Sequence, residues 1–140
     1  MKELIEMLRR GDYSCVVRNG PVVRTFTRPG VADLYSLLKG DAAFLKGAMV
    51  ADKVIGKAAA LVVLCGVKEL YAEVISLLAL MLIRDAGIEV NFSVLVPYIR
   101  NRTGDDWCPL ETLCYKEKKA GDILPLIEGF LKDTGKEKTA

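Results

Sequence analysis

Two lysines stand where an apolar stretch of the chain begins. Lys53 and Lys57 are four residues apart, directly after Asp52, and the residues that follow them up to Cys65 are nearly all apolar. We interpret 51–65 as one helix, so the lysines share a helix face, where like charges cost roughly 0.2–0.5 kcal/mol. The dipole at a helix start also disfavours cations. The placement therefore predicts an anion site, or a desolvated lysine that acts as a nucleophile or base.

The alternative is a solvated helix end, capped by Asp52, from which both lysines reach water. Lys57 lies one turn deeper in the apolar stretch, so it is the candidate catalytic amine. Asp52 and Lys53 are candidate ligand-binding residues. Buried and convergent lysines would indicate a site, whereas lysines splayed into water would indicate an interaction module.

A second group of candidate residues follows Pro97. Asn101, Arg102 and Cys108 flank a polar loop before Pro109, which suits the first turn of a helix. A cysteine before a helix start can be a reactive thiol, and an arginine can pair with a phosphate. Cys108 is thus a second catalytic candidate, and Asn101 and Arg102 are ligand-binding candidates. The alternative is a structural loop with a helix cap.

Ser76 precedes an apolar helical pattern and is suited to cap it. The free N–H groups of a helix start can also bind a phosphate or carboxylate, so Ser76 is a further ligand-binding candidate. Capping alone is the alternative for this residue.

The sequence offers little to a metal ion. It contains no histidine, and its cysteines (Cys15, Cys65, Cys108 and Cys114) form no C-x-x-C pair. Zinc normally requires three or four convergent ligands, so we predict no bound metal and no cofactor. Cys15 and Cys65 lie in apolar runs and are expected to be core thiols.

Composition indicates one soluble domain. We assign residues 1–135 of the 140 to it and 136–140 to a frayed tail. Hydrophobic residues make up 51% of the chain, which favours self-association, and the net charge of +2 makes nucleic acid an improbable partner. No apolar run reaches the about 20 residues that span a bilayer, and the start is a charged amphipathic helix. A cytoplasmic location without membrane contact is expected.

The order of predicted elements indicates an α/β fold with a mixed sheet that begins with a β-hairpin. Asn19-Gly20 between two β-prone runs is the strongest hairpin signal. Helices and strands then alternate, which gives helices on both faces of the sheet, in three α/β/α layers. The predicted helices are 2–10, 31–39 (closed by Gly40), 51–65, 77–86 and 123–131, and the later strands are 69–74 and 88–96.

Two stretches carry a resemblance to a known family. The run ADKVIGKAAA at 51–60 and Asn101-Arg102 followed by CPLE at 108–111 resemble a prokaryotic family of unknown function with a cytidine-deaminase-like fold. In true deaminases, the helix after the hairpin begins with a His-or-Cys, Ala, Glu motif, and the next helix begins with Pro-Cys-x-x-Cys. We place these motifs near 51–53 and 75–78, where no zinc ligand set occurs. The resemblance thus implies a deaminase-like pocket without deaminase chemistry.

Two functions follow as hypotheses. The first is binding of a nucleotide or phosphorylated sugar nucleotide of the ADP-ribose type. Lys53 and Lys57 would attract its anionic part, Asn101 and Arg102 would orient it, and an opened ribose aldehyde would form a Schiff base with a desolvated lysine. The alternative is a non-catalytic homo-oligomeric module that binds protein or RNA. In both cases we expect a dimer or larger assembly.

Overall fold

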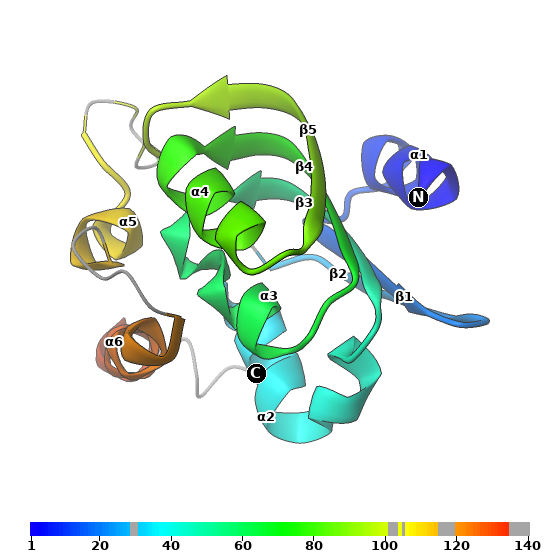
Figure 1. Cartoon of the computed structure of the whole chain (residues 1–140), viewed down its shortest axis with the longest axis horizontal. Helices are drawn as coiled ribbons and strands as arrows, with labels where there is room; N and C mark the ends of the chain where they lie inside the picture. Colours follow the sequence, from blue (N-terminus) through cyan, green and yellow to red (C-terminus); the bar gives the residue numbers. More distant parts are fainter. Residues whose placement is uncertain (29–30, 101–103, 105, 115–119, 135–140) are drawn as a thin grey trace.

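The computed structural model describes residues 1–28, 31–100, 104, 106–114 and 120–134, and its centre is a mixed five-stranded sheet of order β2-β1-β3-β4-β5 (Figure 1). β1 is antiparallel to β2 and β3, whereas β3, β4 and β5 are parallel to one another. The predicted α/β class and mixed sheet are confirmed. The strands are β1 (Cys15–Asn19), β2 (Val22–Phe26), β3 (Met49–Ile55), β4 (Glu69–Ser76) and β5 (Glu89–Val96).

The predicted hairpin opens the sheet. Asn19 of β1 pairs with Val22 of β2, which leaves Gly20 and Pro21 as the turn. Gly20 has a φ of +59°, a conformation that glycine adopts without steric cost. The Asn-Gly signal in the sequence therefore located this turn correctly.

Helices cover both faces of the sheet unequally. α1 (Lys2–Arg10) lies alone on one face, and the other helices lie on the opposite face (Figure 1). Within the described ranges, no helix is both long and apolar enough to cross a membrane. The helices of the larger layer are α2 (Ala32–Leu45), the 3₁₀ turn η1 (Lys57–Ala59), α3 (Ala60–Leu64), α4 (Leu77–Asp85), α5 (Pro109–Cys114) and α6 (Ala120–Thr134).

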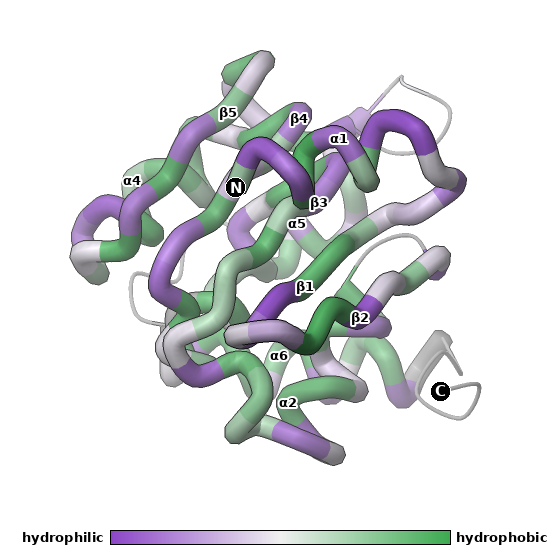
Figure 2. Tube along the Cα trace, turned by 90° about the vertical axis from the view of Figure 1, so that its right-hand side faces the viewer, coloured by the Kyte–Doolittle hydropathy of each residue, from purple (hydrophilic) through white to green (hydrophobic). Residues whose placement is uncertain are grey.

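α1 is attached to the sheet by an apolar contact and a polar one. Leu4 and Leu8 are buried against residues of β1, β3 and β4 in a small core of their own, and Figure 2 looks onto this face. Beside it, Arg9 donates through Nε to Glu73 at 2.7 Å and through Nη2 to the hydroxyl of Tyr71 at 3.0 Å. Arg9 Nη2 also lies 3.4 Å from Ser93 Oγ, so the helix reaches both β4 and β5.

The predicted helix over 51–65 is wrong in its first half. Residues up to Ile55 belong to β3, and only η1 and α3 are helical. β3 lies between β1 and β4, with residues 50–52 buried in a row and the two exposed residues, Lys53 and Val54, adjacent to each other, so the strand shows no two-residue period. Lys53 and Lys57 consequently do not share a helix face, and Gly56 lies at the end of a strand.

The structure also corrects two smaller predictions. The helix expected to stop at Gly40 continues to Leu45 as α2, with a break at Asp41, whose φ is −155° and ψ is 64°. In β4, Ala72 and Ile75 both face the main core although they are three residues apart, so the strand does not alternate strictly there. Val74, two residues after Ala72, is not part of that core.

Candidate functional site

The buried polar side chains gather at the edge where the parallel strands end. Among the described residues these are Asp33, Asp52, Lys57, Ser76 and Glu111. Ser76 ends β4, Lys57 follows β3, and Asp33 lies in the first turn of the helix that follows β2. β2 and β3 are both antiparallel to β1, so they end at the same edge. The carboxyl ends of parallel strands are where open α/β sheets usually bind ligands.

Glu111 joins the loop after β3 to the loop after β5. Its side chain is 2% exposed; Oε1 accepts the N–H of Lys57 at 2.6 Å and Oε2 accepts the N–H of Ile99 at 2.8 Å. Gly56 leaves room for this carboxylate, because a Cβ there would lie 3.2 and 3.3 Å from its oxygens and 3.1 Å from Ile99 Cγ1. The sequence indicated Glu111 only as an acid at a helix start, and no signal revealed this role.

The two lysines have different surroundings. Lys57 is 7% exposed and begins η1, whereas Lys53 is exposed on β3. The predicted convergent pair is therefore not formed, and of the two only Lys57 belongs to the buried cluster.

Asp52 is buried beside a thiol. It lies opposite Cys15 in the β1–β3 ladder, and its Oδ1 accepts the N–H of Val54 at 3.1 Å. Burial raises the pKa of the Asp52 carboxyl to about 7, and the negative charge of Asp33 adds to this, while hydrogen bonds from Val54, Cys15 and Lys53 oppose it. Burial, followed by the charge of Asp52, raises the pKa of the Cys15 thiol well above its usual value.

Asp33 fixes the chain between β2 and α2. Its Oδ1 pairs with Arg28 Nε at 2.5 Å, and its Oδ2 accepts the main-chain N–H of Arg28 at 3.0 Å. Arg28 Nη2 donates to Ser36 Oγ at 3.2 Å. The pair is a structural clamp at the same edge as the other buried polar groups.

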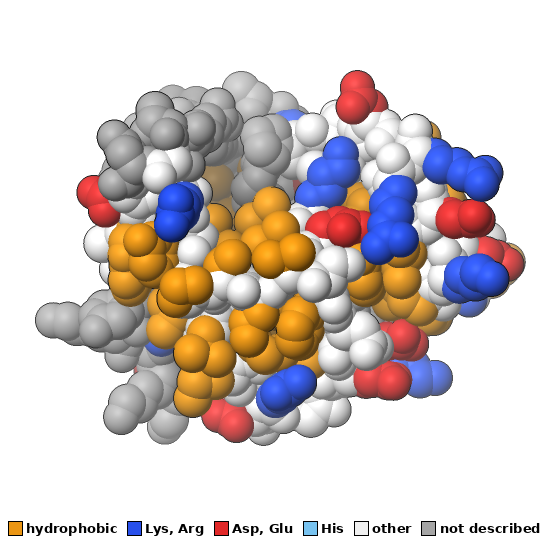
Figure 3. Space-filling model, turned by 90° about the horizontal axis from the view of Figure 1, so that it is seen from above, with side chains coloured by type: hydrophobic (Ala, Val, Ile, Leu, Met, Phe, Trp, Pro, Cys, Tyr) orange, Lys and Arg blue, Asp and Glu red, His pale blue; other side chains and the backbone are white. Residues whose placement is uncertain are grey.

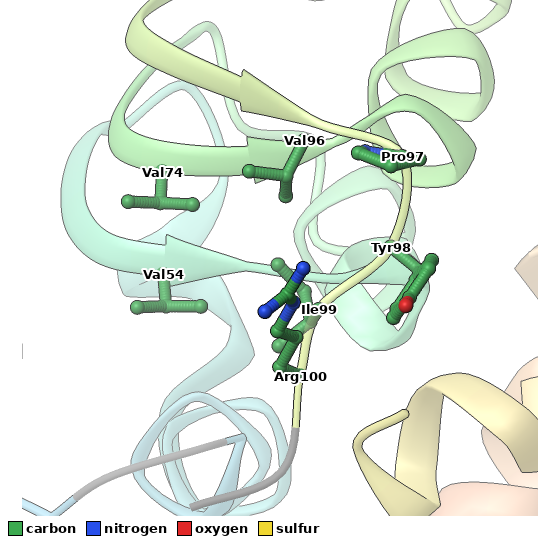
Figure 4. Close-up of a pocket in the computed structure, with 7 residues that line it drawn as sticks. All are labelled: Val54, Val74, Val96, Pro97, Tyr98, Ile99 and Arg100. Atoms are coloured by element: carbon green, nitrogen blue, oxygen red, sulfur yellow. The ribbon is translucent and has the colours of Figure 1, made fainter. Parts of the chain in front are cut away.

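A pocket of about 380 Å³ adjoins this cluster. Figure 4 shows the side chains of Val54 and Val74 pointing the same way, with the guanidinium of Arg100 between them and Tyr98 in that view. The pocket is connected to the cluster through Ile99, whose N–H is held by Glu111. Its lining is Val54, Val74, Val96, Pro97, Tyr98, Ile99 and Arg100.

The outer wall of the pocket is stiffened by an aromatic pair. Tyr98 stacks on Trp107 with ring centroids 4.6 Å apart and planes 15° apart. Arg100 and Trp107 form an isolated antiparallel bridge, and Cys108 donates its N–H to the carbonyl of Ile99 at 2.8 Å. Sequence reasoning selected Arg102 in this loop and missed Arg100, because the order of residues in a loop does not show which arginine lines a pocket.

The other predicted site residues are placed as follows. Ser76 is fully buried and caps α4, accepting the N–H of Ala79 at 3.2 Å, so its predicted capping role is confirmed. Cys108 is half-buried at the start of α5, beside Ile99 rather than in the pocket lining. Asn101 and Arg102 lie outside the described residues.

The two positions that the deaminase resemblance singled out have different surroundings. Residues 51–53 lie within β3 rather than at a helix start. Residues 75–78 lie where β4 ends and α4 begins, as expected. The described residues contain no group of three or more His, Cys, Asp or Glu side chains placed to hold a metal ion.

These features define an α/β protein with a polar cluster and a pocket at the carboxyl edge of its sheet. A family described as "TM1506: Domain of unknown function (DUF1893)" matches residues 3–131. The protein belongs to this DUF1893 family.

A solved structure supports the fold. The chain is similar to the crystal structure of a DUF1893 family protein (TM1506) from Thermotoga maritima, with a TM-score of 0.85 and 24% identity over 91% of this chain and 87% of that one. It is also similar to Acinetobacter baumannii RibD, form 2, with a TM-score of 0.42 and 20% identity over 66% of this chain and 33% of that one. No curated protein matches the chain.

Proposed function

We propose that the protein binds a nucleotide or phosphorylated sugar nucleotide of the ADP-ribose type at the carboxyl edge of its sheet. The observation that carries the proposal is the pocket of about 380 Å³, which has an apolar floor and Arg100 at its wall, beside the buried polar cluster. Ligand sites are typically apolar clefts of about 300–1,000 Å³ with few, well-placed polar groups.

The lining suits the two halves of such a ligand. Val54, Val74 and Val96 offer an apolar surface to a flat heterocycle. Arg100 offers a guanidinium, whose planar fork of N–H donors matches a phosphate group. An adenosine moiety on the valines with a phosphate on Arg100 therefore satisfies both parts of the pocket.

Lys57 supplies the proposed chemistry. Its N–H is held by Glu111, which also holds the N–H of Ile99 in the pocket lining. A lysine amine adds to the aldehyde of an opened ribose and forms an imine, with loss of one water.

The alternative, a non-catalytic homo-oligomeric module that binds protein or RNA, is favoured less by the same residues. Lysines splayed into water were its expected sign, and only Lys53 is exposed. Lys57 is buried at 7% exposure, which supports a site.

Removal of the Arg100 charge tests ligand binding. We expect ADP-ribose to bind the wild-type protein, and Arg100→Gln to weaken it about 10-fold or more, because a charge-assisted hydrogen bond contributes about 1.5–3 kcal/mol. Adenosine, which has no phosphate, should bind both proteins equally in isothermal titration calorimetry. Arg84→Gln, an exposed arginine at the far end of α4, is the matched control. Absence of ADP-ribose binding to the wild-type protein at millimolar concentration would refute the proposal.

Borohydride trapping tests Lys57. With ADP-ribose and sodium borohydride, hydride reduces an imine to a stable secondary amine, and intact mass spectrometry should show one adduct that peptide mapping places on Lys57. Lys57→Met keeps the length and apolar bulk of the side chain and should lose the adduct, whereas Lys53→Met, at an exposed position, should keep it. Adduct on Lys57→Met at the wild-type level, or mapping to surface lysines, would show that Lys57 is structural.

A further inference from the structure

The two edges of the sheet are protected to different degrees. β2 forms one edge: it is five residues long, follows Pro21, and carries Arg24, which pairs with Asp41 at 3.0 Å. β5 forms the other edge and is eight residues long, with neither lysine nor proline and with Glu89, at its first position, as its only charge. Its pairing with β4 keeps the same offset from Glu69↔Glu89 to Ser76↔Val96, so no bulge interrupts it. Long, uncharged edges are normally covered, because their free N–H and C=O groups pair with other strands.

Apolar side chains flank the β5 edge. The exposed fractions are 50% for Val94 and 45% for Leu95 on β5, and 44% for Leu77 and 58% for Met81 on the adjacent α4. Seen from above, on the side where β5 forms the edge, hydrophobic side chains gather over β5 and α4, and most of the charged ones lie toward α1 (Figure 3). Leu95, in register with the core residue Ile75, lies on the α4 face with Leu77 and Met81, whereas Val94, in register with Val74, lies on the opposite face. Exposed apolar side chains thus border both faces of the β5 edge, and such surfaces mark interaction sites.

We propose that β5 pairs antiparallel with β5 of a second copy of the chain, which continues the sheet across a two-fold axis, with α4 of each copy against the other. A two-fold contact uses the same patch on both copies and closes, so it produces a dimer rather than a fibre. Pairing of β5 with β2 of another copy would form an open chain, and Pro21 and Arg24 oppose it on the β2 side.

The charges at the two ends of β5 support this partner. Asp85 and Glu89, with Arg84 beside them, give the starting end one excess negative charge, and Arg100 follows the finishing end. Antiparallel pairing brings the starting end of each copy to the finishing end of the other, so Glu89 of one copy approaches Arg100 of the other, although Asp106 beside Trp107 offsets the charge of Arg100. Electrostatic complementarity of this kind fixes the register and orientation of an interface.

Light scattering and sedimentation at 10–100 µM (about the range of ordinary solution work) test the interface. The wild-type protein should have about twice the chain mass of 15.4 kDa. Val94→Lys places a charge on the edge strand, on the face opposite α4, and should give the monomer, with an unchanged circular dichroism spectrum. Met81→Glu on α4 should shift the equilibrium the same way and does not depend on the strand. Val22→Lys makes an equivalent change at a position 48% exposed on the β2 edge and should remain dimeric.

A wild-type monomer at these concentrations would overturn the proposal, and so would a species larger than a dimer. A dimer that survives both Val94→Lys and Met81→Glu would place the contact elsewhere. Ligand binding by the pocket is measured separately, so its failure leaves this inference standing.

Discussion

The carboxyl group of Asp52 is buried, and the described contacts include no ion pair that would neutralise its charge. Its pKa is raised to about 7, whereas an unfolded chain holds it at the usual value of 3.8. The folded state therefore keeps a proton that the unfolded state has already released between these two values. The contribution of Asp52 to the free energy of unfolding is largest below the pKa of 3.8 that it has in the unfolded chain. This contribution is lost as the pH rises toward 7, because ionisation of Asp52 favours unfolding.

Asp52→Asn should remove this dependence. The amide retains the oxygen that accepts the N–H of Val54, but it cannot ionise. Between pH 5 and pH 8, we expect the free energy of unfolding of the variant to gain about 2–3 kcal/mol relative to the wild-type protein, from 1.36 kcal/mol per pKa unit. Urea denaturation at both pH values measures the difference. Asp12→Asn, at an exposed position, should show no such gain, and an equal change in both variants would contradict the role of Asp52.

The site could be predicted from the sequence only in part. Lys57 and Asp52 were selected because charged residues beside an apolar run are unusual, and both are buried. Glu111 and Arg100 were missed as site residues because their importance depends on which loops meet in space. No spacing along the chain brings Lys57 and Ile99 to the two oxygens of one carboxylate.

At the scale of elements, α5 is connected to the site by hydrogen bonds of the Glu111 side chain. Glu111 accepts one N–H from the loop after β3 and one from the loop after β5. The short helix thus sets the distance between the segment that begins with Lys57 and the wall of the pocket.

Glu111→Gln should loosen both loops. The amide has one acceptor oxygen, so one buried N–H loses its partner, at a cost of about 1–3 kcal/mol in the free energy of unfolding. Hydrogen exchange should accelerate at the amides of Lys57 and Ile99, and urea denaturation gives the loss of stability. Glu128→Gln removes a partly exposed carboxylate of α6 that pairs with Lys39, and should cost less than about 1 kcal/mol. Equal losses in the two variants would show that Glu111 has no special role.

Elements with a clear local signal were predicted well, and those defined by their neighbours were not. α1, the hairpin and β5 have an amphipathic period, a turn dipeptide and flanking breakers that act locally. β3 was taken for a helix because its burial comes from β1, β4 and the helices around it, which are distant in sequence. Periodicity reports the alternation of buried and exposed residues, and β3, with its buried residues and its exposed residues each in a row, gives no period.

At the scale of the whole molecule, the order of elements along the chain predicts the three layers. It does not predict which edge strand of the sheet is available to pair with another chain. The sequence favoured self-association through its apolar composition. The sheet order adds which strand is left unpaired, because β2 and β5 become edges only once β3 is placed between β1 and β4. The prediction of a dimer consequently becomes the more specific prediction that the β5 edge forms the contact.

The contacts of Arg9 also constrain the order in which the chain is completed during synthesis. Its partners Tyr71, Glu73 and Ser93 are separated from it by 62, 64 and 84 residues. The ribosome releases the chain from its amino end, so α1 emerges before β4 and β5 and cannot complete its docking until both have followed. Until then Leu4 and Leu8 have only part of their cover, that from β1 and β3, in the nascent chain, and chaperones recognise such exposed apolar surfaces. The polar contacts of Arg9 are therefore made only after β5 has been synthesised.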